Sequence, residues 1–208
     1  MIELADGIWR WTARHPDWHP SGEFGAEVGS YAAHEGGRTV LIDPLLPDDA
    51  ALATLDEIVT GEVVVAVTVT YHVRDSAAAV ARWGGVVSGH PDVERRLPEG
   101  TPFDPDAGLN WHQLKRGKER SLELAGLRAL AFGDRIVGVD GGLRYWSSNK
   151  ITEARRAFFH RQTAPQLRHL LDVDFDRALV THGEPVLRDG HQALEDALAG
   201  EPWYHRPS

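Results

Sequence analysis

The stretch from Val64 to Val69 constrains the fold of this chain more than any other. It reads Val-Val-Ala-Val-Thr-Val, so its apolar residues are continuous and do not alternate with polar ones. This pattern is typical of a β-strand that is covered on both faces, as in layered α/β proteins. Polar residues come directly after it, in the order Thr70-Tyr71-His72-Val73-Arg74-Asp75-Ser76. Because α/β proteins assemble their sites beyond the carboxyl ends of strands, we expect a functional site here.

The composition is that of an ordinary globular domain. The chain has 208 residues, of which 42% are hydrophobic and 25% are charged, and we interpret residues 1–208 as a single domain. Its net charge of −9 argues against a general nucleic-acid or anionic-membrane partner, since phosphate contacts need a basic surface. We find no membrane-spanning run or signal-peptide pattern, so a cytoplasmic location is the default expectation.

Several local patterns predict individual elements. Glu35-Gly36-Gly37-Arg38 indicates a hairpin turn, and the apolar spacing between Asp48 and Thr60 predicts a helix. Three strands are expected between Leu109 and Phe132, and a helix over 152–162. The glycine-rich segment from Gly138 to Trp146 has no clear period, and we expect a mobile stretch that borders the pocket.

Four motifs, taken in order, resemble the metallo-β-lactamase superfamily. They are Gly29-Ser30-Tyr31 with Leu41-Ile42-Asp43, the strand and turn ending at His72, Leu130-Ala131-Phe132-Gly133-Asp134, and Thr181-His182-Gly183-Glu184-Pro185. The resemblance spans roughly the whole chain. It implies an α/β (α+β) fold of four layers, an αββα sandwich with the site along the edge where the strand ends meet. It also implies that Asp43 lies beside the site as support.

The ligand motif of this family is incomplete in the chain. Where the family has H-x-H-x-D-H, the chain has His72, Arg74, Ser76 and Ala77, and no histidine occurs between Lys115 and Glu119. The resemblance leaves His72, Asp134 and His182 as the candidate metal ligands. We therefore do not expect a two-metal centre, and either no metal or one zinc, iron or manganese ion fits the remaining residues.

The positive charge of Arg74 could take the place of a metal ion. Its guanidinium cannot donate a lone pair and would lie close to any dication. We hypothesise that Arg74 forms a bidentate pair with Asp134 and leaves His72 and His182 as hydrogen-bonding imidazoles. His72, Arg74, Asp134 and His182 are then the candidate catalytic residues.

Loops and neighbouring residues complete the expected pocket. Trp18 and Phe24 lie in an irregular segment rich in proline and glycine, and we expect them to contact a ligand together with Asp43 and Tyr71. His15 and His19 could lend a nitrogen. The basic cluster from Lys115 to Arg120 is either a solvated loop or a patch that attracts anions to the site.

Three classes of function stay open, and whether the protein is an enzyme is uncertain. The first is a metal-free protein that binds a small anionic ligand through Arg74. The second is a single-metal hydrolase of esters, thioesters or amides that uses His72, Asp134 and His182. The third is metal-free acid-base catalysis by His72 or His182. A purely structural role is also open, and a homodimer is possible at the base rate for such proteins.

Overall fold

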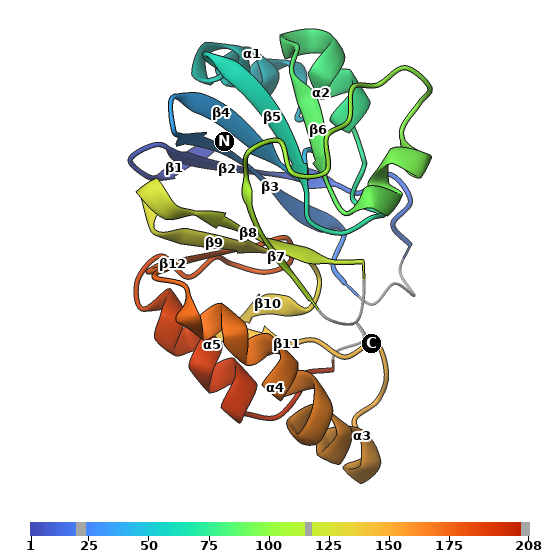
Figure 1. Cartoon of the computed structure of the whole chain (residues 1–208), viewed down its shortest axis with the longest axis vertical. Coiled ribbons are helices and arrows are strands. Elements are labelled where there is room, and N and C mark those ends of the chain that lie inside the picture. Colours follow the sequence, from blue (N-terminus) through green and yellow to red (C-terminus); the bar gives the residue numbers. More distant parts are fainter. Residues whose placement is uncertain (20–23, 115–117, 205–208) are drawn as a thin grey trace.

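The computed structural model describes residues 1–19, 24–114 and 118–204, and its elements form four layers (Figure 1). Two sheets pack face to face, and helices cover the outer face of each. The predicted αββα sandwich is confirmed. Lys115, Arg116 and Gly117, part of the basic cluster discussed above, lie outside the described residues.

The first sheet contains the buried strand predicted from the sequence, which is β5. Its strands follow chain order, antiparallel from β1 to β4 and parallel from β4 to β6. The hairpin at Gly36-Gly37 joins β3 to β4 as predicted. The strands are β1 (Ile2–Ala5), β2 (Ile8–Arg14), β3 (Glu27–Glu35), β4 (Arg38–Ile42), β5 (Glu62–Val67) and β6 (Val86–Gly89).

Strand β5 is apolar on both faces because each face packs against a different layer. Val63, Val65 and Val67 lie in a cluster with Leu55 of α1 (Asp49–Ile58) and Ala79 of α2 (Ser76–Trp83). Ala66 points the other way, into the core between the two sheets. Burying one valine side chain contributes roughly 1.5–3 kcal/mol, so the continuous run is a large share of the stability of this sheet.

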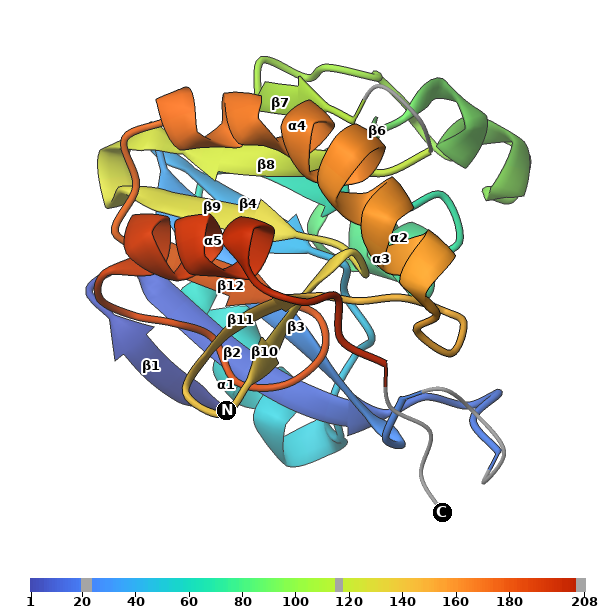
Figure 2. The ribbon, with the colours of Figure 1, turned by 90° about the horizontal axis from the view of Figure 1, so that it is seen from below.

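The second sheet has the order β12-β9-β8-β7, and helices from the C-terminal half cover its outer face (Figure 2). Its strands are β7 (Asn110–Gln113), β8 (Arg120–Leu124), β9 (Ala129–Phe132) and β12 (Arg177–Val180), and the covering helices include α4 (Ala164–Leu167) and α5 (Gly190–Ala199). Strands β7 to β9 pair antiparallel, as predicted. Within the described ranges, none of the helices combines the length and apolar composition needed to cross a bilayer.

Two segments differ from the sequence-based expectation. The glycine-rich stretch near Gly138 is a regular hairpin of β10 (Ile136–Val139) and β11 (Gly142–Tyr145), because Asp140-Gly141 supplies a turn with positive φ at both residues. The helix expected over 152–162 is α3 (Glu153–Phe158), which continues into a π-helical turn at Phe159–Thr163 and then into α4.

The β10–β11 hairpin holds the loop that carries His182. The amide of Gly138 donates to the carbonyl oxygen of His182 at 3.0 Å. The two backbones approach so closely that a Cβ added at Gly138 would lie 2.0 Å from the carbonyl oxygen of Glu184. Arg10 binds the same loop by donating to the carbonyl oxygen of Gly183 at 2.8 Å. The position of His182 therefore depends on a contact that only glycine permits.

We predict that Gly138→Ala destabilises the protein by about 2–3 kcal/mol, because the new methyl group collides with backbone that cannot move away cheaply. Urea unfolding followed by circular dichroism measures this change. Gly142→Ala is the matched control, since the nearest atom to its Cβ lies 4.0 Å away, and it should shift the free energy of unfolding by less than about 1 kcal/mol. Equal effects of the two substitutions would contradict the prediction.

Candidate functional site

Asp43 is the buried carboxylate beneath the site, at the end of β4. Its side chain accepts hydrogen bonds from the Thr68 amide at 2.8 Å and the Thr68 hydroxyl at 2.5 Å. It also accepts from His72 Nδ1 at 2.9 Å and from the Thr181 hydroxyl at 3.2 Å. Burial would raise the pKa of Asp43, but His72 and the other donors outweigh it and lower that pKa. Asp43 is therefore ionised, and it joins segments from both sheets.

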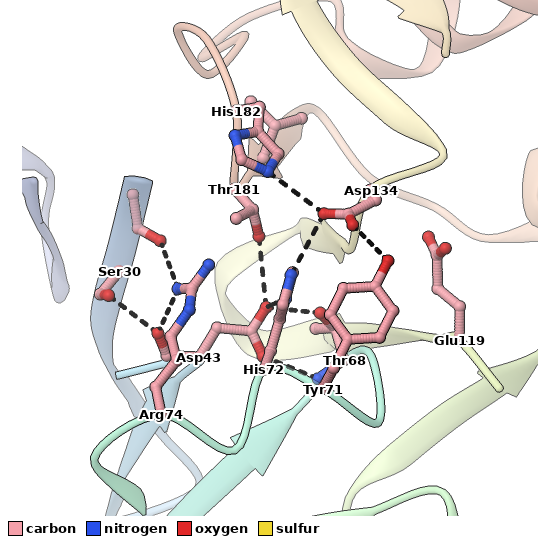
Figure 3. Close-up of polar contacts among 12 residues, drawn as sticks. Ser30, Asp43, Thr68, Tyr71, His72, Arg74, Glu119, Asp134, Thr181 and His182 are labelled. Atoms are coloured by element: carbon pink, nitrogen blue, oxygen red, sulfur yellow. Dashed lines mark hydrogen bonds and ion pairs between the residues drawn. The ribbon is translucent and has the colours of Figure 1, made fainter. Parts of the chain in front are cut away.

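Three side chains converge above Asp43, as predicted (Figure 3). Oδ1 of Asp134 lies 3.2 Å from Nε2 of His72 and 3.3 Å from Nε2 of His182. One ligand atom from each of the three residues lies within 4.8 Å of the others. His72 follows β5, Asp134 follows β9 and His182 follows β12, so the strand ends of both sheets form the cluster.

The two oxygens of Asp134 have different surroundings. Oδ2 accepts a hydrogen bond from the Tyr71 hydroxyl at 2.5 Å. Oδ1 is buried and, among the described residues, has no partner with hydrogen-bond geometry, although two imidazole nitrogens lie within 3.3 Å of it. A buried carboxylate oxygen that lies between two imidazole nitrogens is part of a donor set that suits a divalent metal ion.

The electrostatics of the cluster follow from burial and from the two carboxylates. Burial alone would lower the pKa of His72, but Asp134 and Asp43 outweigh it and raise that pKa to about 9. His182 packs against the ring of Phe24, and burial lowers the pKa of this histidine. Burial would raise the pKa of Asp134, but His72 and His182 hold it well below its usual value. With no metal, His72 therefore carries a proton at neutral pH.

Arg74 does not pair with Asp134, and the predicted bidentate pair is wrong. Its Nη1 donates to the carbonyl oxygen of Asp43 at 2.7 Å and to that of Gly29 at 3.4 Å. These backbone carbonyl oxygens occupy the guanidinium in place of Asp134, and Arg74 itself has a left-handed φ of 33°. Nε of Arg74 is buried and has no partner among the described residues.

A cavity of about 200 Å³ opens over the cluster and contains most of the predicted ligand-binding residues. Trp18, Phe24 and Tyr71 line it, together with Arg74 and the three candidate ligands, and so do His15 and His19. Phe24 stacks on the His182 ring at a centroid distance of 3.6 Å, and the Trp18 indole donates to the Phe24 carbonyl at 2.9 Å. Asp43 lies beneath the cavity and not in its wall.

Glu119 is a buried residue beside the cluster that the sequence pattern did not indicate. We interpreted residues 115–120 as a solvated or anion-attracting loop, but Glu119 is only 4% exposed and lies beside Asp134 and Arg135. Burial, and then the charge of Asp134, raises the pKa of Glu119 to about 8. Its neighbours have structural contacts, since Lys118 pairs with Asp92 and Arg120 donates to the carbonyl of Pro105. Glu119 occupies the region where the resemblance places the missing histidine. This position in the sequence could have indicated that Glu119 lies beside the site.

Comparison with solved structures decides the fold family. A metallo-β-lactamase from Erythrobacter litoralis matches 95% of this chain and 91% of its own, with 18% identity and a TM-score of 0.58. The mono-zinc form of FIM-1 from Pseudomonas aeruginosa matches 95% of each chain, with 14% identity and a TM-score of 0.55. The chain has the metallo-β-lactamase fold.

A third structure extends the comparison beyond the enzymes named as β-lactamases. The metallo-β-lactamase family protein TTHA1429 from Thermus thermophilus matches 95% of this chain and 80% of its own, with 17% identity and a TM-score of 0.55. No family model matches the sequence, and no curated protein does. At these identities the metallo-β-lactamase fold is shared, and the chemistry must be argued from the cluster itself.

We predict that Glu119→Gln raises the melting temperature more at pH 8.5 than at pH 5.5. In the folded protein the Glu119 carboxyl keeps its proton up to about pH 8, whereas the unfolded chain loses it near pH 4.5. The folded state thus binds the extra proton between these values, and stability falls as the pH rises through this window. Glutamine removes this loss, and each kcal/mol moves the melting temperature by about 2–4 °C.

Differential scanning fluorimetry across this pH range, with a chelator present, measures the effect. Glu57→Gln is the matched control, because Glu57 is exposed on α1 and its substitution should give a profile parallel to that of the wild type. A Glu119→Gln profile that also runs parallel to the wild type would contradict the prediction.

Proposed function

We propose that the protein is a single-metal hydrolase that holds its ion with His72, Asp134 and His182. The observation that carries this proposal is the position of Asp134 Oδ1, which is buried between two imidazole nitrogens without a well-formed hydrogen bond. Zinc, iron and manganese all accept two imidazoles and one carboxylate. A divalent ion in such a site supplies Lewis acidity, which lowers the pKa of water toward about 7 and polarises a carbonyl group.

Asp43 prepares His72 for this role. Because Nδ1 of His72 donates to Asp43, the lone pair that remains for coordination is on Nε2, which faces Asp134 and His182. A carboxylate behind a ligating histidine fixes the ring orientation and raises its basicity. Tyr71 orients Asp134 in the same way through its hydrogen bond to Oδ2.

The remaining side chains suit a carbonyl substrate. Hydrolysis of an ester, thioester or amide adds the oxygen of water to the carbonyl carbon and breaks the bond to the leaving oxygen, sulfur or nitrogen, which takes up a proton. Burial, together with the charge of Asp134, raises the pKa of Tyr71, so its hydroxyl keeps its proton at neutral pH. That single proton is donated to Asp134 Oδ2, so Tyr71 holds the carboxylate in place and only its oxygen lone pairs face a substrate. Phe24 and Trp18 supply apolar surface that limits the access of water to the cavity.

A second candidate is a metal-free protein that binds a small anionic ligand. It is favoured by Arg74, whose side chain lines the cavity and whose buried Nε is without a partner among the described residues. A carboxylate or phosphate could accept from this nitrogen. The two candidates differ in one measurable property, the presence of a tightly held metal.

We predict that the purified protein retains about one equivalent of zinc, iron or manganese, and that His182→Ala lowers the affinity at least about 100-fold, because two ligands hold an ion far less tightly than three. Elemental mass spectrometry on tag-free protein, before and after incubation with each metal, measures the content. His160→Ala removes an exposed imidazole from the turn after α3 and should keep the metal. A wild-type protein that takes up no metal would exclude the hydrolase and favour the anion-binding candidate.

We predict that Asp43→Asn weakens metal binding by about 10–100-fold, because the amide loses the charge that supports His72. Competition against a chromogenic chelator measures the affinity. Asp75→Asn is the control, since the Asp75 carboxylate accepts a hydrogen bond from the Leu46 amide and does not contact His72. If the folded Asp43→Asn protein bound metal as tightly as the wild type, the role assigned to Asp43 in supporting His72 would be wrong.

A further inference from the structure

A cavity larger than the one over the candidate metal cluster lies away from it and is mainly apolar. It has a volume of about 430 Å³ and lies between the β10–β11 hairpin and the helical layer formed by α3, the π-helical turn and α4. Figure 2 shows these helices crossing over the outer side of the second sheet. Its apolar wall includes Leu114, Ile151, Phe158, Phe159, Leu167 and Pro202.

An irregularity of the helical layer accompanies this cavity. The backbone changes from α-helix to a wider π-helical turn at Phe159–Thr163, and Pro165 follows, which has no amide hydrogen to donate. Phe158 at the end of α3 is 53% exposed, although it is one of the large apolar side chains of the chain. π-helical turns occur frequently at functional sites, and an exposed aromatic in the wall of a cavity is typical of a ligand pocket.

The apolar cavity adjoins a second cavity of about 220 Å³, which borders the candidate metal cluster. The two share Arg135, Tyr145 and Ser147 in their walls. The second cavity in turn shares Tyr71 and Asp134 with the cavity over the cluster. The second cavity therefore shares walls with both the apolar cavity and the cavity over the cluster, and we call this series of three the row.

The junction of the row is polar and carries cations. Arg135 donates to the Tyr145 hydroxyl at 3.0 Å, and its Nε lies 3.7 Å from Glu119. Lys118 lines the same junction. A molecule that extends along the row would meet metal ligands at one end, hydrogen-bond donors in the middle and hydrocarbon at the other end.

We propose that the apolar cavity receives the aliphatic acyl chain of the substrate, while its carbonyl group lies near the His72–Asp134–His182 cluster. This inference rests on the proposed hydrolase function and specifies its substrate class, an ester, thioester or amide of a medium-length fatty acid. Arg135 lies in the walls of both the apolar cavity and the polar junction.

The binding test uses octanoate as the probe and isothermal titration calorimetry as the measurement. Each methylene that leaves water contributes roughly fourfold in affinity, so octanoate should bind at least about 10-fold more tightly than butanoate. Ala154→Trp places an indole in the cavity wall from an exposed position on α3 and should weaken octanoate binding at least about 10-fold. Glu153→Trp adds the same group at the preceding residue, which is exposed and does not line the cavity, and it should leave binding unchanged.

A second arm separates failure of this inference from failure of the proposed function. His182→Ala should keep the preference for octanoate over butanoate, because the apolar cavity that binds the chain does not include His182. If 4-nitrophenyl octanoate and acetate are both hydrolysed, the octanoate ester should be preferred in kcat/KM, and Ala154→Trp should abolish the preference. If no ester is hydrolysed but octanoate binding depends on Ala154, the acyl pocket stands and the hydrolase proposal fails. Absence of octanoate binding, or binding that Ala154→Trp leaves intact, would overturn the inference.

Discussion

The buried carboxylate of Asp43 is the interaction on which the rest of the site depends. It accepts four hydrogen bonds, from Thr68 twice, from His72 and from Thr181, and it is only 1% exposed. Thr68 follows β5 in the first sheet and Thr181 follows β12 in the second. If the sheets moved relative to each other, Asp43 would lose hydrogen bonds, and a buried charge with fewer donors would cost several kcal/mol. These bonds therefore fix how the two sheets are placed at this edge. The sandwich and the site are stabilised by the same contacts.

Other contacts at this edge reinforce the same arrangement. The Tyr31 hydroxyl donates to the Val180 carbonyl at 2.7 Å, and the Gly29 amide donates to the Thr181 carbonyl at 2.8 Å. These bonds connect β3 directly to the end of β12. His72 follows a strand of one sheet and His182 a strand of the other. Because protein interiors are close-packed and resist deformation, these bonds restrict the movement of the two imidazoles relative to each other. A cluster supported in this way is preorganised for a ligand, since little order has to be gained on binding.

Sequence reasoning predicted the features that depend on a pattern along the chain. The continuous apolar run gave β5, and the order of the four motifs gave His72, Asp134 and His182, which the structure brings together. Arg74 was placed wrongly because its partners are the backbone carbonyl oxygens of Gly29 and Asp43, which only the tertiary fold brings beside it. Glu119 was missed because charged residues flank it, and only the pairing of the strands shows that its side chain points inward.

The two helical layers of the protein pack differently against their sheets. On the first sheet, α1 and α2 pack their buried faces against β5 without interruption. On the second sheet, the π-helical turn and Pro165 break the regular packing, and a cavity lies beside the break. None of the hydrogen bonds to Asp43 described above involves this layer, so its side chains can change without disturbing the cluster. If the apolar cavity holds an acyl chain, as we propose, ligand choice is separable from the support of the site, and substitutions in α3 and α4 should alter it.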